Sequence, residues 1–183
     1  MDSRELLLKK LRLHKGVDEL EESMRLRIIR FIEGHADCFH RSLLEGHITA
    51  SALVVNADKT KTLMTHHHKL NKWLQLGGHS DGDPDPLNVA LREVKEESGL
   101  KNVVPLSEEI FDVDVHEIPE RKNEPAHVHY DIRFLFQAHD GDPLTISNES
   151  KDLAWIPLHS MDQYTAEESI LRMIRKLSAM KEQ

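Results

Sequence analysis

The chain has 183 residues, with 32 acidic against 24 basic residues, 13 histidines and one cysteine, for a formal net charge of -8. This length predicts one domain, and 39% apolar residues provide material for a sizeable core. The acidic balance argues against nucleic acid as a main partner, because phosphate neutralisation needs clustered Lys and Arg. With no run of 18 apolar residues and with Cys38 unable to form an intrachain disulfide, we expect a cytoplasmic protein without membrane contact.

The first 46 residues carry helix signals only. Ser3 is predicted to cap a short first helix, and Asp18 with Glu21 fits a capping box for a second helix that ends at Gly34. A further helical stretch is expected over residues 37–44. Since no strand signal occurs here, we predict an N-terminal helical arm that packs against the domain or, in a homodimer, against a second copy of the chain.

From residue 47 onward the pattern changes to short runs rich in β-branched and apolar residues. The predicted strands are 48–55, 61–67, 73–76, 113–118, 128–138 and 154–156. The third of these is expected to end at the pair Gly77 and Gly78. A last helix is predicted over 165–180, with Thr165 and Glu168 as its capping box. Strands, a helix, strands and a final helix predict an α/β layered domain rather than alternating βαβ units.

Residues 78–100 hold the signals of a capped amphipathic helix that follows a loop rich in carboxylates. Asp85 suits the N-cap, Pro86 the first helical position, and Gly99 the C-terminal stop. Apolar residues recur at positions i, i+3, i+4 and i+7, so one face of this helix is predicted to be buried. These apolar residues are Leu87, Ala90, Leu91 and Val94.

Three glutamates, Glu93, Glu96 and Glu97, share one arc of roughly 100° beside that apolar face. Like charges at this spacing repel by roughly 0.2–0.5 kcal/mol per pair, and alone they indicate a solvated helix face. Six carboxylates nevertheless fall between positions 81 and 97, against only two basic residues. Hard divalent cations such as Mg²⁺ select oxygen ligands of this kind and offset their repulsion, which favours metal-assisted chemistry on a phosphate.

The same residues resemble the signature of the Nudix hydrolase family, which is Gly, five residues, Glu, seven residues, then Arg-Glu-apolar-x-Glu-Glu-x-Gly-apolar. Gly78 matches the opening glycine at the right spacing, and residues 92–100 match the whole second half. Pro84 stands where the first signature Glu is expected. Asp83 and Asp85 are the neighbouring carboxylates that could replace that Glu.

The resemblance covers about residues 47–180 and implies a Nudix α/β/α sandwich with a mixed sheet, extended by the helical arm. We therefore predict an arm over 1–46 and a Nudix domain over 47–183. The implied activity is hydrolysis of a small-molecule nucleoside diphosphate linked to another moiety, with water attacking phosphorus and the pyrophosphate bond breaking. Mg²⁺ is the implied cofactor, with Mn²⁺ as the alternative.

Carried over position by position, the resemblance also implies the site. The carboxylates expected to bind metal and take part in catalysis are Glu93, Glu96 and Glu97. The backbone carbonyl of Gly77 joins the metal ligands, and Glu149, before the last strand, is a candidate general base. The structural residues of the motif are Gly78, Arg92 and Gly99. Arg92 is expected to orient Glu96 through an i,i+4 pair.

Histidines form a second group of candidates. His127, His129 and Asp131 alternate along a predicted strand and therefore share one face. Lining of the catalytic cleft and a half-exposed polar surface explain this pattern equally well, and a dedicated transition-metal site is the weaker alternative. We expect His127 and His129, together with Lys69 and His79, to bind substrate.

Two alternatives to a hydrolase stay open at this point. Pro84 favours a nucleotide-binding or regulatory Nudix module with weak or no catalysis. An isomerase is the other alternative, since the Nudix fold also hosts isopentenyl diphosphate isomerase. That activity should demand an acid-base cysteine, whereas Cys38 lies in the arm. Within the hydrolase interpretation, nucleotide sugars, ADP-ribose, dinucleoside polyphosphates and non-canonical nucleoside triphosphates all offer the same diphosphate chemistry.

Overall fold

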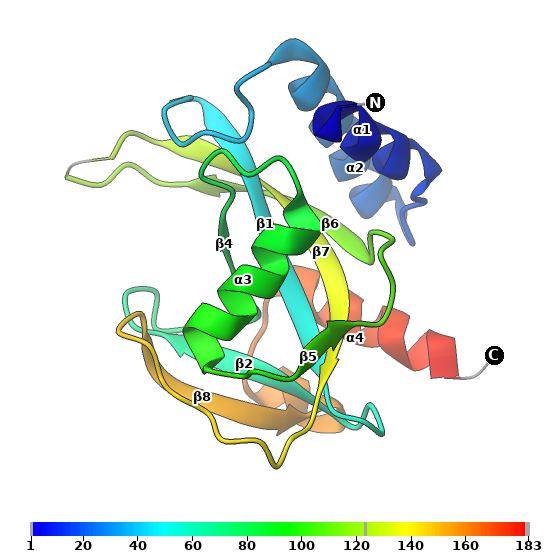
Figure 1. Ribbon diagram of the computed structural model, residues 1–183, viewed down its shortest axis with the longest axis vertical. Helices are drawn as coiled ribbons and strands as arrows, with labels where there is room; N and C mark the ends of the chain where they lie inside the picture. The colour runs from blue at the N-terminus through cyan, green and yellow to red at the C-terminus, as the bar shows by residue number, and fades with distance from the viewer. Residues whose placement is uncertain (1, 123, 182–183) are drawn as a thin grey trace.

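The structure is a computed structural model that describes residues 2–122 and 124–181. Its helices are α1 (Ser3–Leu13), α2 (Glu19–Gly34), α3 (Pro86–Ser98), the 3-10 helix η1 (Leu158–Gln163) and α4 (Glu168–Lys181). Its strands are β1 (Gly46–Val55), β2 (Lys61–His67), β3 (Trp73–Leu74), β4 (Leu76–His79), β5 (Val103–Pro105), β6 (Asp112–Ile118), β7 (His127–Ala138) and β8 (Ser150–Pro157). Figure 1 shows α3 crossing in front of the strands and α1 with α2 at one end.

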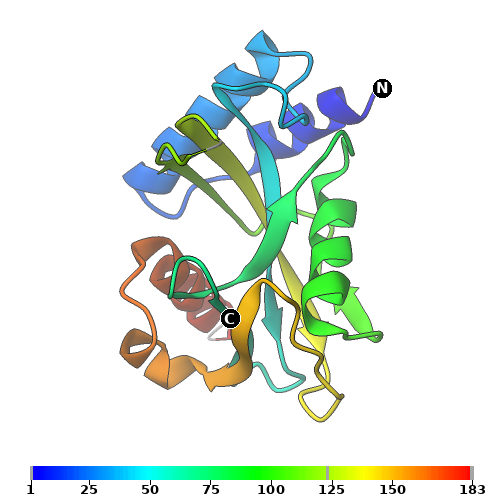
Figure 2. The same ribbon diagram turned by 90° about the vertical axis from the view of Figure 1, so that its left-hand side faces the viewer.

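The strands form one mixed sheet with β1 and β7 at its centre, parallel to each other over their whole length. The other edge of β1 is shared by β4 and, further along, by β2, both antiparallel. The other edge of β7 is shared in the same way by β6 and β5. Figure 2 shows α3 and α4 on opposite sides of the strands. This is the predicted α/β/α sandwich with its N-terminal helices.

Alternation along β1 and β7 gives the two faces of the sheet different partners. The face that carries Ile48 and Tyr130 belongs to a core shared with α1, α2 and α3, and Phe31 of α2 stacks on Tyr130 at 3.9 Å between ring centroids. The face that carries Leu53 and Leu135 packs against α4. Nearer the start of the two strands this second face is polar, with His47, Thr49, Ser51, His127, His129, Asp131 and Arg133.

The N-terminal helices match the prediction except at two places. Asp18 caps α2, which ends at Gly34, but the cap of α1 is Asp2 and not Ser3, because the Asp2 carboxylate accepts the Glu5 N–H at 2.8 Å. The helix predicted over 37–44 is wrong, since this segment forms successive turns. The Cys38 carbonyl, which a helix would use internally, accepts the Ile48 N–H of β1 at 2.8 Å instead.

Several strand and helix boundaries also differ from the prediction: β8 begins at Ser150 and not at residue 154, and β5 is not among the predicted strands. The glycine pair does not end a strand, because β4 continues through Gly77 and Gly78 and pairs them with Ser51 and Ala50 of β1. The last helix begins at Glu168, three residues later than predicted, after the 3-10 helix η1. Within residues 2–122 and 124–181, no helix is long and apolar enough to cross a membrane.

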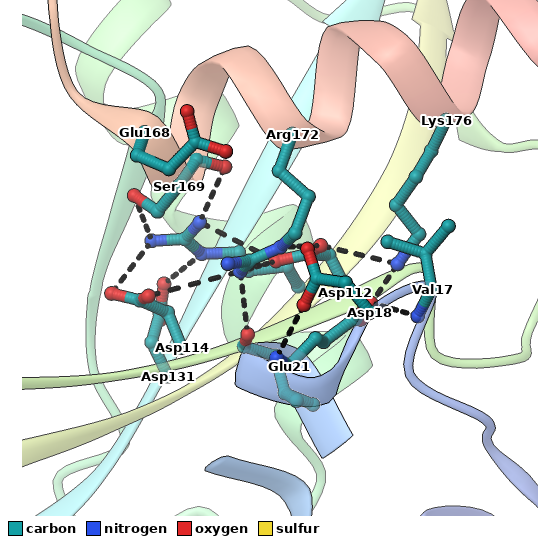
Figure 3. Close-up of polar contacts among 12 residues, drawn as sticks. Val17, Asp18, Glu21, Asp112, Asp114, Asp131, Glu168, Ser169, Arg172 and Lys176 are labelled. Atoms are coloured by element: carbon teal, nitrogen blue, oxygen red, sulfur yellow. Dashed lines mark hydrogen bonds and ion pairs between the residues drawn. The ribbon is translucent and has the colours of Figure 1, made fainter. Parts of the chain in front are cut away.

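A buried network of ion pairs joins α4 to the polar part of the sheet (Figure 3). Arg133 of β7 bonds Asp131 at 2.8 Å and also reaches Asp114 of β6 at 3.3 Å. Arg172 of α4 forms two hydrogen bonds, of 2.9 and 2.7 Å, with Asp112 of β6. An unpaired buried charge is costly. The ion pair between Arg172 and Asp112 therefore specifies how α4 packs on the sheet.

The same network reaches the N-terminal arm through Glu21 of α2. Its carboxylate accepts hydrogen bonds from Lys176 of α4 at 2.6 Å, from the Val17 N–H at 2.7 Å and from His14 of α1 at 2.9 Å. Burial alone would raise the pKa of Glu21, yet these three hydrogen bonds lower it to about 2. The arm is therefore bound to the rest of the chain by one buried carboxylate as well as by apolar contacts.

We expect Glu21→Gln to lower the free energy of unfolding by about 3 kcal/mol at pH 7, because the carboxylate has a folded pKa of about 2 against 4.5 in the unfolded chain. A depressed pKa stabilises the fold above the unfolded value, so the difference should be full above about pH 5 and vanish as pH falls toward 2. Urea unfolding at several pH values measures it. Glu19→Gln, at an exposed position of the same helix, is the control, and equal losses in both variants would contradict the account.

Candidate active site

Helix α3 presents the predicted carboxylates with the boundaries that its caps specify. The Asp85 carboxylate accepts the N–H of Leu87 at 3.1 Å, and Pro86 occupies the first turn. At the other end Gly99 has a φ of 72°, a left-handed conformation that glycine adopts without strain, and its N–H donates to the Lys95 carbonyl at 2.9 Å. The helix is thereby held at both ends against β1 and β4.

Two of the three glutamates of α3 point toward β4, and the third faces solvent. Glu97 is 9% exposed, whereas the Glu96 side chain is 64% exposed. Burial, and next the Glu93 carboxylate, raise the pKa of Glu97 to about 8 against a hydrogen bond from the Gly77 N–H. Burial also raises the pKa of Glu93, against its contact with Arg92. Ionisation of Glu97 therefore carries an electrostatic cost in the free protein.

Gly78 gives Glu93 its place. A Cβ added to Gly78 would lie 2.5 Å from the carboxyl carbon of Glu93, so only a residue without a side chain lets this carboxylate lie against β4. Gly77 is similarly confined, because its Cβ would lie 2.4 Å from the Cβ of Ser51. The glycine pair therefore serves close packing of β4 between β1 and α3.

Arg92 forms the expected i,i+4 ion pair with Glu96 only as a long contact, and its hydrogen bonds go to other groups. Its guanidinium donates to the His79 carbonyl at 2.8 Å and to the Glu93 carboxylate at 2.9 Å. Its distance to Glu96 is 4.0 Å, which is too long for a hydrogen bond. Because Glu93 lies against β4, the guanidinium that bonds it also reaches the strand backbone. Arg92 thus positions Glu93 and links α3 to β4 through these hydrogen bonds.

The two carboxylates beside Pro84 accept hydrogen bonds from groups nearby in the chain. Asp83 accepts a hydrogen bond from Asn88 at 2.7 Å, and Asp85 is occupied as the helix cap. The pKa of Arg92 is raised chiefly by its hydrogen bond to Glu93, and Asp83 adds a smaller electrostatic contribution. That Asp83 replaces the missing signature Glu stays a prediction.

Glu149 and Lys69 lie on neighbouring loops. The Glu149 carbonyl accepts the His68 N–H at 2.7 Å, which joins the loop before β8 to the turn that contains Lys69. Both side chains are exposed. The Glu149 carboxylate contributes, after burial and Glu93, to the raised pKa of Glu97, so it lies on the same side of the molecule as the α3 glutamates.

The histidines gather on the other face of β4. His79 pairs with Thr49 across β1 and β4, so its ring lies on the face opposite Gly78 and Glu93. Its ring centroid is 4.9 Å from that of His129, and the Nε2 atoms of His129 and His127 are 3.1 Å apart. The structure thus brings these three predicted residues together, and their role in substrate binding stays a prediction.

Sequence reasoning missed His47, which completes this group from β1. Its ring is 5.0 Å from those of both His127 and His129. The available signal was the alternation of His47 with Thr49 and Ser51 in an otherwise apolar strand. Burial lowers the pKa of His47, lowers that of His79 to about 4, and, with the neighbouring imidazoles, lowers that of His129 to about 2. These rings are therefore neutral at pH 7.

Comparisons with known proteins agree with this architecture. The family model of the NUDIX domain matches residues 46–177. A protein of Lactococcus lactis subsp. cremoris (strain MG1363), named a probable DHNTP pyrophosphohydrolase, is 32% identical over 131 residues, which cover 70% of this chain and 71% of that protein.

Two solved structures share the fold. The MutT protein from Methanosarcina mazei Go1 has a TM-score of 0.59 and 19% identity, over 77% of this chain and 99% of its own. The Ap4A hydrolase of C. elegans has a TM-score of 0.56 and 20% identity, over 73% of this chain and 96% of its own.

A mixed sheet between helices, with a glycine-led helix of glutamates packed against it, is the α/β/α sandwich of the Nudix fold. The chain belongs to the Nudix family. It is a Nudix pyrophosphohydrolase, an enzyme that cleaves the pyrophosphate bond of a nucleoside diphosphate derivative.

We expect Gly78→Ala to reduce kcat/KM at least about 10-fold, since the new Cβ must displace the Glu93 carboxylate, and to change the free energy of unfolding little, because the displaced atoms are the far end of a flexible side chain. Steady-state kinetics and urea unfolding measure the two effects. Gly34→Ala is the matched control, because among the described residues nothing lies within 4 Å of a Cβ at that position. Wild-type kinetics in Gly78→Ala would refute the role of this contact.

Proposed function

We propose that the chain is a divalent-metal-dependent hydrolase of a nucleoside diphosphate linked to another moiety, with Mg²⁺ as cofactor and Mn²⁺ as the alternative. The observation that carries the proposal is the placement of Glu93 and Glu97 together against the glycine pair of β4. A buried carboxylate beside a second one is unfavourable in the free protein, as the raised pKa of Glu97 records. A divalent cation would remove that penalty.

The residues present fit such a cation. The proposed ligands are carboxylate and carbonyl oxygens, the donors that Mg²⁺ and Mn²⁺ prefer: Glu93, Glu96, Glu97 and the Gly77 carbonyl. Glu97 and Gly77 are already in contact through the Gly77 N–H. When bound, the cation supplies charge neutralisation at the diphosphate oxygens and a more acidic water.

Side chains of the protein position the ligands, accept the proton and bind the phosphate. Arg92 and Gly78 keep the Glu93 carboxylate in position through the contacts described above. Glu149, exposed and on the same side as the α3 glutamates, takes the proton of the water that attacks phosphorus. Lys69, on the adjoining turn, contacts the phosphate oxygens of the substrate. In this scheme the pyrophosphate bond breaks and the leaving phosphate departs toward solvent.

A nucleotide-binding module without efficient catalysis is the second candidate, and Pro84 is the observation that favours it. Hydrolysis and binding are separated by a panel of nucleotide sugars, ADP-ribose and nucleoside triphosphates, incubated with Mg²⁺ or Mn²⁺ and analysed by chromatography. DHNTP and Ap4A belong in this panel, because similar proteins are named for them. Product release supports the hydrolase, and tight binding without product over hours supports the module.

We expect Glu97→Gln to reduce kcat/KM at least about 100-fold at saturating Mg²⁺, because the variant loses a ligand oxygen and a negative charge. Mg²⁺ should also raise the melting temperature of the wild type and leave that of Glu97→Gln unchanged. Glu109→Gln, at an exposed loop position, is the control and should match the wild type in both assays. Turnover of Glu97→Gln close to that of the wild type would contradict the assignment of Glu97 as a metal ligand.

We also retain the division into an arm over 1–46 and a Nudix domain over 47–183, a cytoplasmic location and a homodimer as proposals. The support for a dimer is a set of exposed apolar residues on or next to α1 and α2: Leu6, Leu13, Val17, Leu20 and Leu26. We expect light scattering to give twice the chain mass at micromolar concentration. A monomer under those conditions would contradict the dimer.

A further inference from the structure

A cluster of imidazoles lies on the face of β4 opposite the α3 glutamates. We call His47, His79, His127 and His129 the histidine cluster. The strand register places it, because His47 of β1 and His129 of β7 are direct partners and His79 of β4 lies beside them. The ring centroids of neighbouring members are 4.9–5.1 Å apart. Three strands thus deliver imidazoles to one point.

The cluster contains nitrogen atoms that the protein leaves unsatisfied. His47 is 4% exposed, and neither of its ring nitrogens has a well-formed hydrogen bond to any described residue. The buried Nε2 atom of His79 likewise has no hydrogen-bond partner among residues 2–122 and 124–181. Buried polar groups without partners are rare in folded proteins, so each requires an explanation.

His127 is held in the tautomer of a metal ligand. Its Nδ1 lies 2.9 Å from the Pro125 carbonyl, so the ring proton sits on Nδ1 and donates to that oxygen. The lone pair of Nε2 is then directed into the cluster, toward the Nε2 of His129 at 3.1 Å. A backbone carbonyl bonded to the far nitrogen is the usual partner of a metal-bound histidine.

The spacing of the nitrogens suits a small transition-metal ion. One ring nitrogen each from His47, His127 and His129 lies within 4.8 Å of the other two. In a tetrahedral zinc site with Zn–N bonds of about 2.0 Å, ligand nitrogens are about 3.3 Å apart, close to the His127–His129 distance. A modest rotation of the His47 ring would complete such a site.

Asp131, a carboxylate on the same face, is not available as a metal ligand. Asp131 accepts hydrogen bonds from Thr49 at 2.9 Å, from Ser51 at 2.7 Å and from Arg133 at 2.8 Å. Glu124 is the carboxylate near the cluster that stays half-exposed, with its Oε1 3.7 Å from the Nε2 of His127. The donors are therefore mainly imidazole nitrogens, which selects Zn²⁺ and similar ions over Mg²⁺.

We infer that His47, His127 and His129 form a three-histidine site for Zn²⁺ or a similar transition-metal ion, distinct from the glutamates of α3. The ion joins β1 to β7 and lies beside His79, whose backbone carbonyl holds Arg92. With three protein ligands, one coordination position stays open for water or an anionic ligand.

The test is calorimetric titration of tag-free, chelator-stripped protein with Zn²⁺, with millimolar Mg²⁺ present to occupy the glutamates. We expect one equivalent of Zn²⁺ with a submicromolar dissociation constant. His47→Gln should weaken binding at least 100-fold, beyond the 10–100-fold typical of losing a mere supporting partner. Far-UV circular dichroism checks that His47→Gln folds.

Two matched variants exclude the other sites. The double variant His66→Gln/His68→Gln, on the β2 turn, and Glu97→Gln, on α3, should both bind Zn²⁺ as the wild type does. Should His47→Gln fail to fold, nitrogen NMR of wild-type imidazoles decides, because Zn²⁺ should shift the Nε2 signals of His127 and His129. Absence of submicromolar binding, or its loss in Glu97→Gln or in the β2 double variant, overturns the proposal.

Discussion

The contact between Gly78 of β4 and the Glu93 carboxylate of α3 is the constraint on which the rest of the site depends. A methyl group added at Gly78 would meet the end of the Glu93 side chain, so the carboxylate could not keep this position. At this separation Arg92 reaches the His79 carbonyl and Glu97 reaches the Gly77 N–H. The close approach collects carboxylates where their mutual repulsion is strongest, and so creates a place that a cation would stabilise.

The strand that carries these glycines also separates two kinds of chemistry. On one side of β4, Gly78 faces the oxygen atoms of Glu93. On the other side, His79 faces imidazoles from β1 and β7. Alternation along a strand makes Gly78 and His79 point to opposite faces, so the carboxylates of α3 and the imidazoles meet opposite sides of β4. The single sheet can therefore support two sites with different preferences.

Local patterns in the sequence predicted much of this arrangement. The caps Asp85 and Gly99 and the apolar spacing between them specify α3, because capping and helical periodicity involve residues close together in the chain. The grouping of Glu93, Glu96 and Glu97 on one arc follows from the same helix geometry. A strand as long as β7 is similarly visible in its β-branched and aromatic residues.

Contacts between distant segments could not be predicted in this way. His47 joins His129 only through the parallel register of β1 and β7, which no local pattern states. Arg92 bonds Glu93 and not Glu96 because β4 lies beside it. The turns at 37–44 replace a helix because Cys38 bonds Ile48 of β1. In each case a partner far along the chain outweighs the local preference.

Diffraction from crystals soaked in Mn²⁺ would test the central claim most directly, because the anomalous signal locates the ion itself. The account predicts a Mn²⁺ peak between the carboxylates of Glu93 and Glu97, next to the Gly77 carbonyl. A peak confined to other parts of the molecule, with the two carboxylates left without an ion at saturating Mn²⁺, would contradict it.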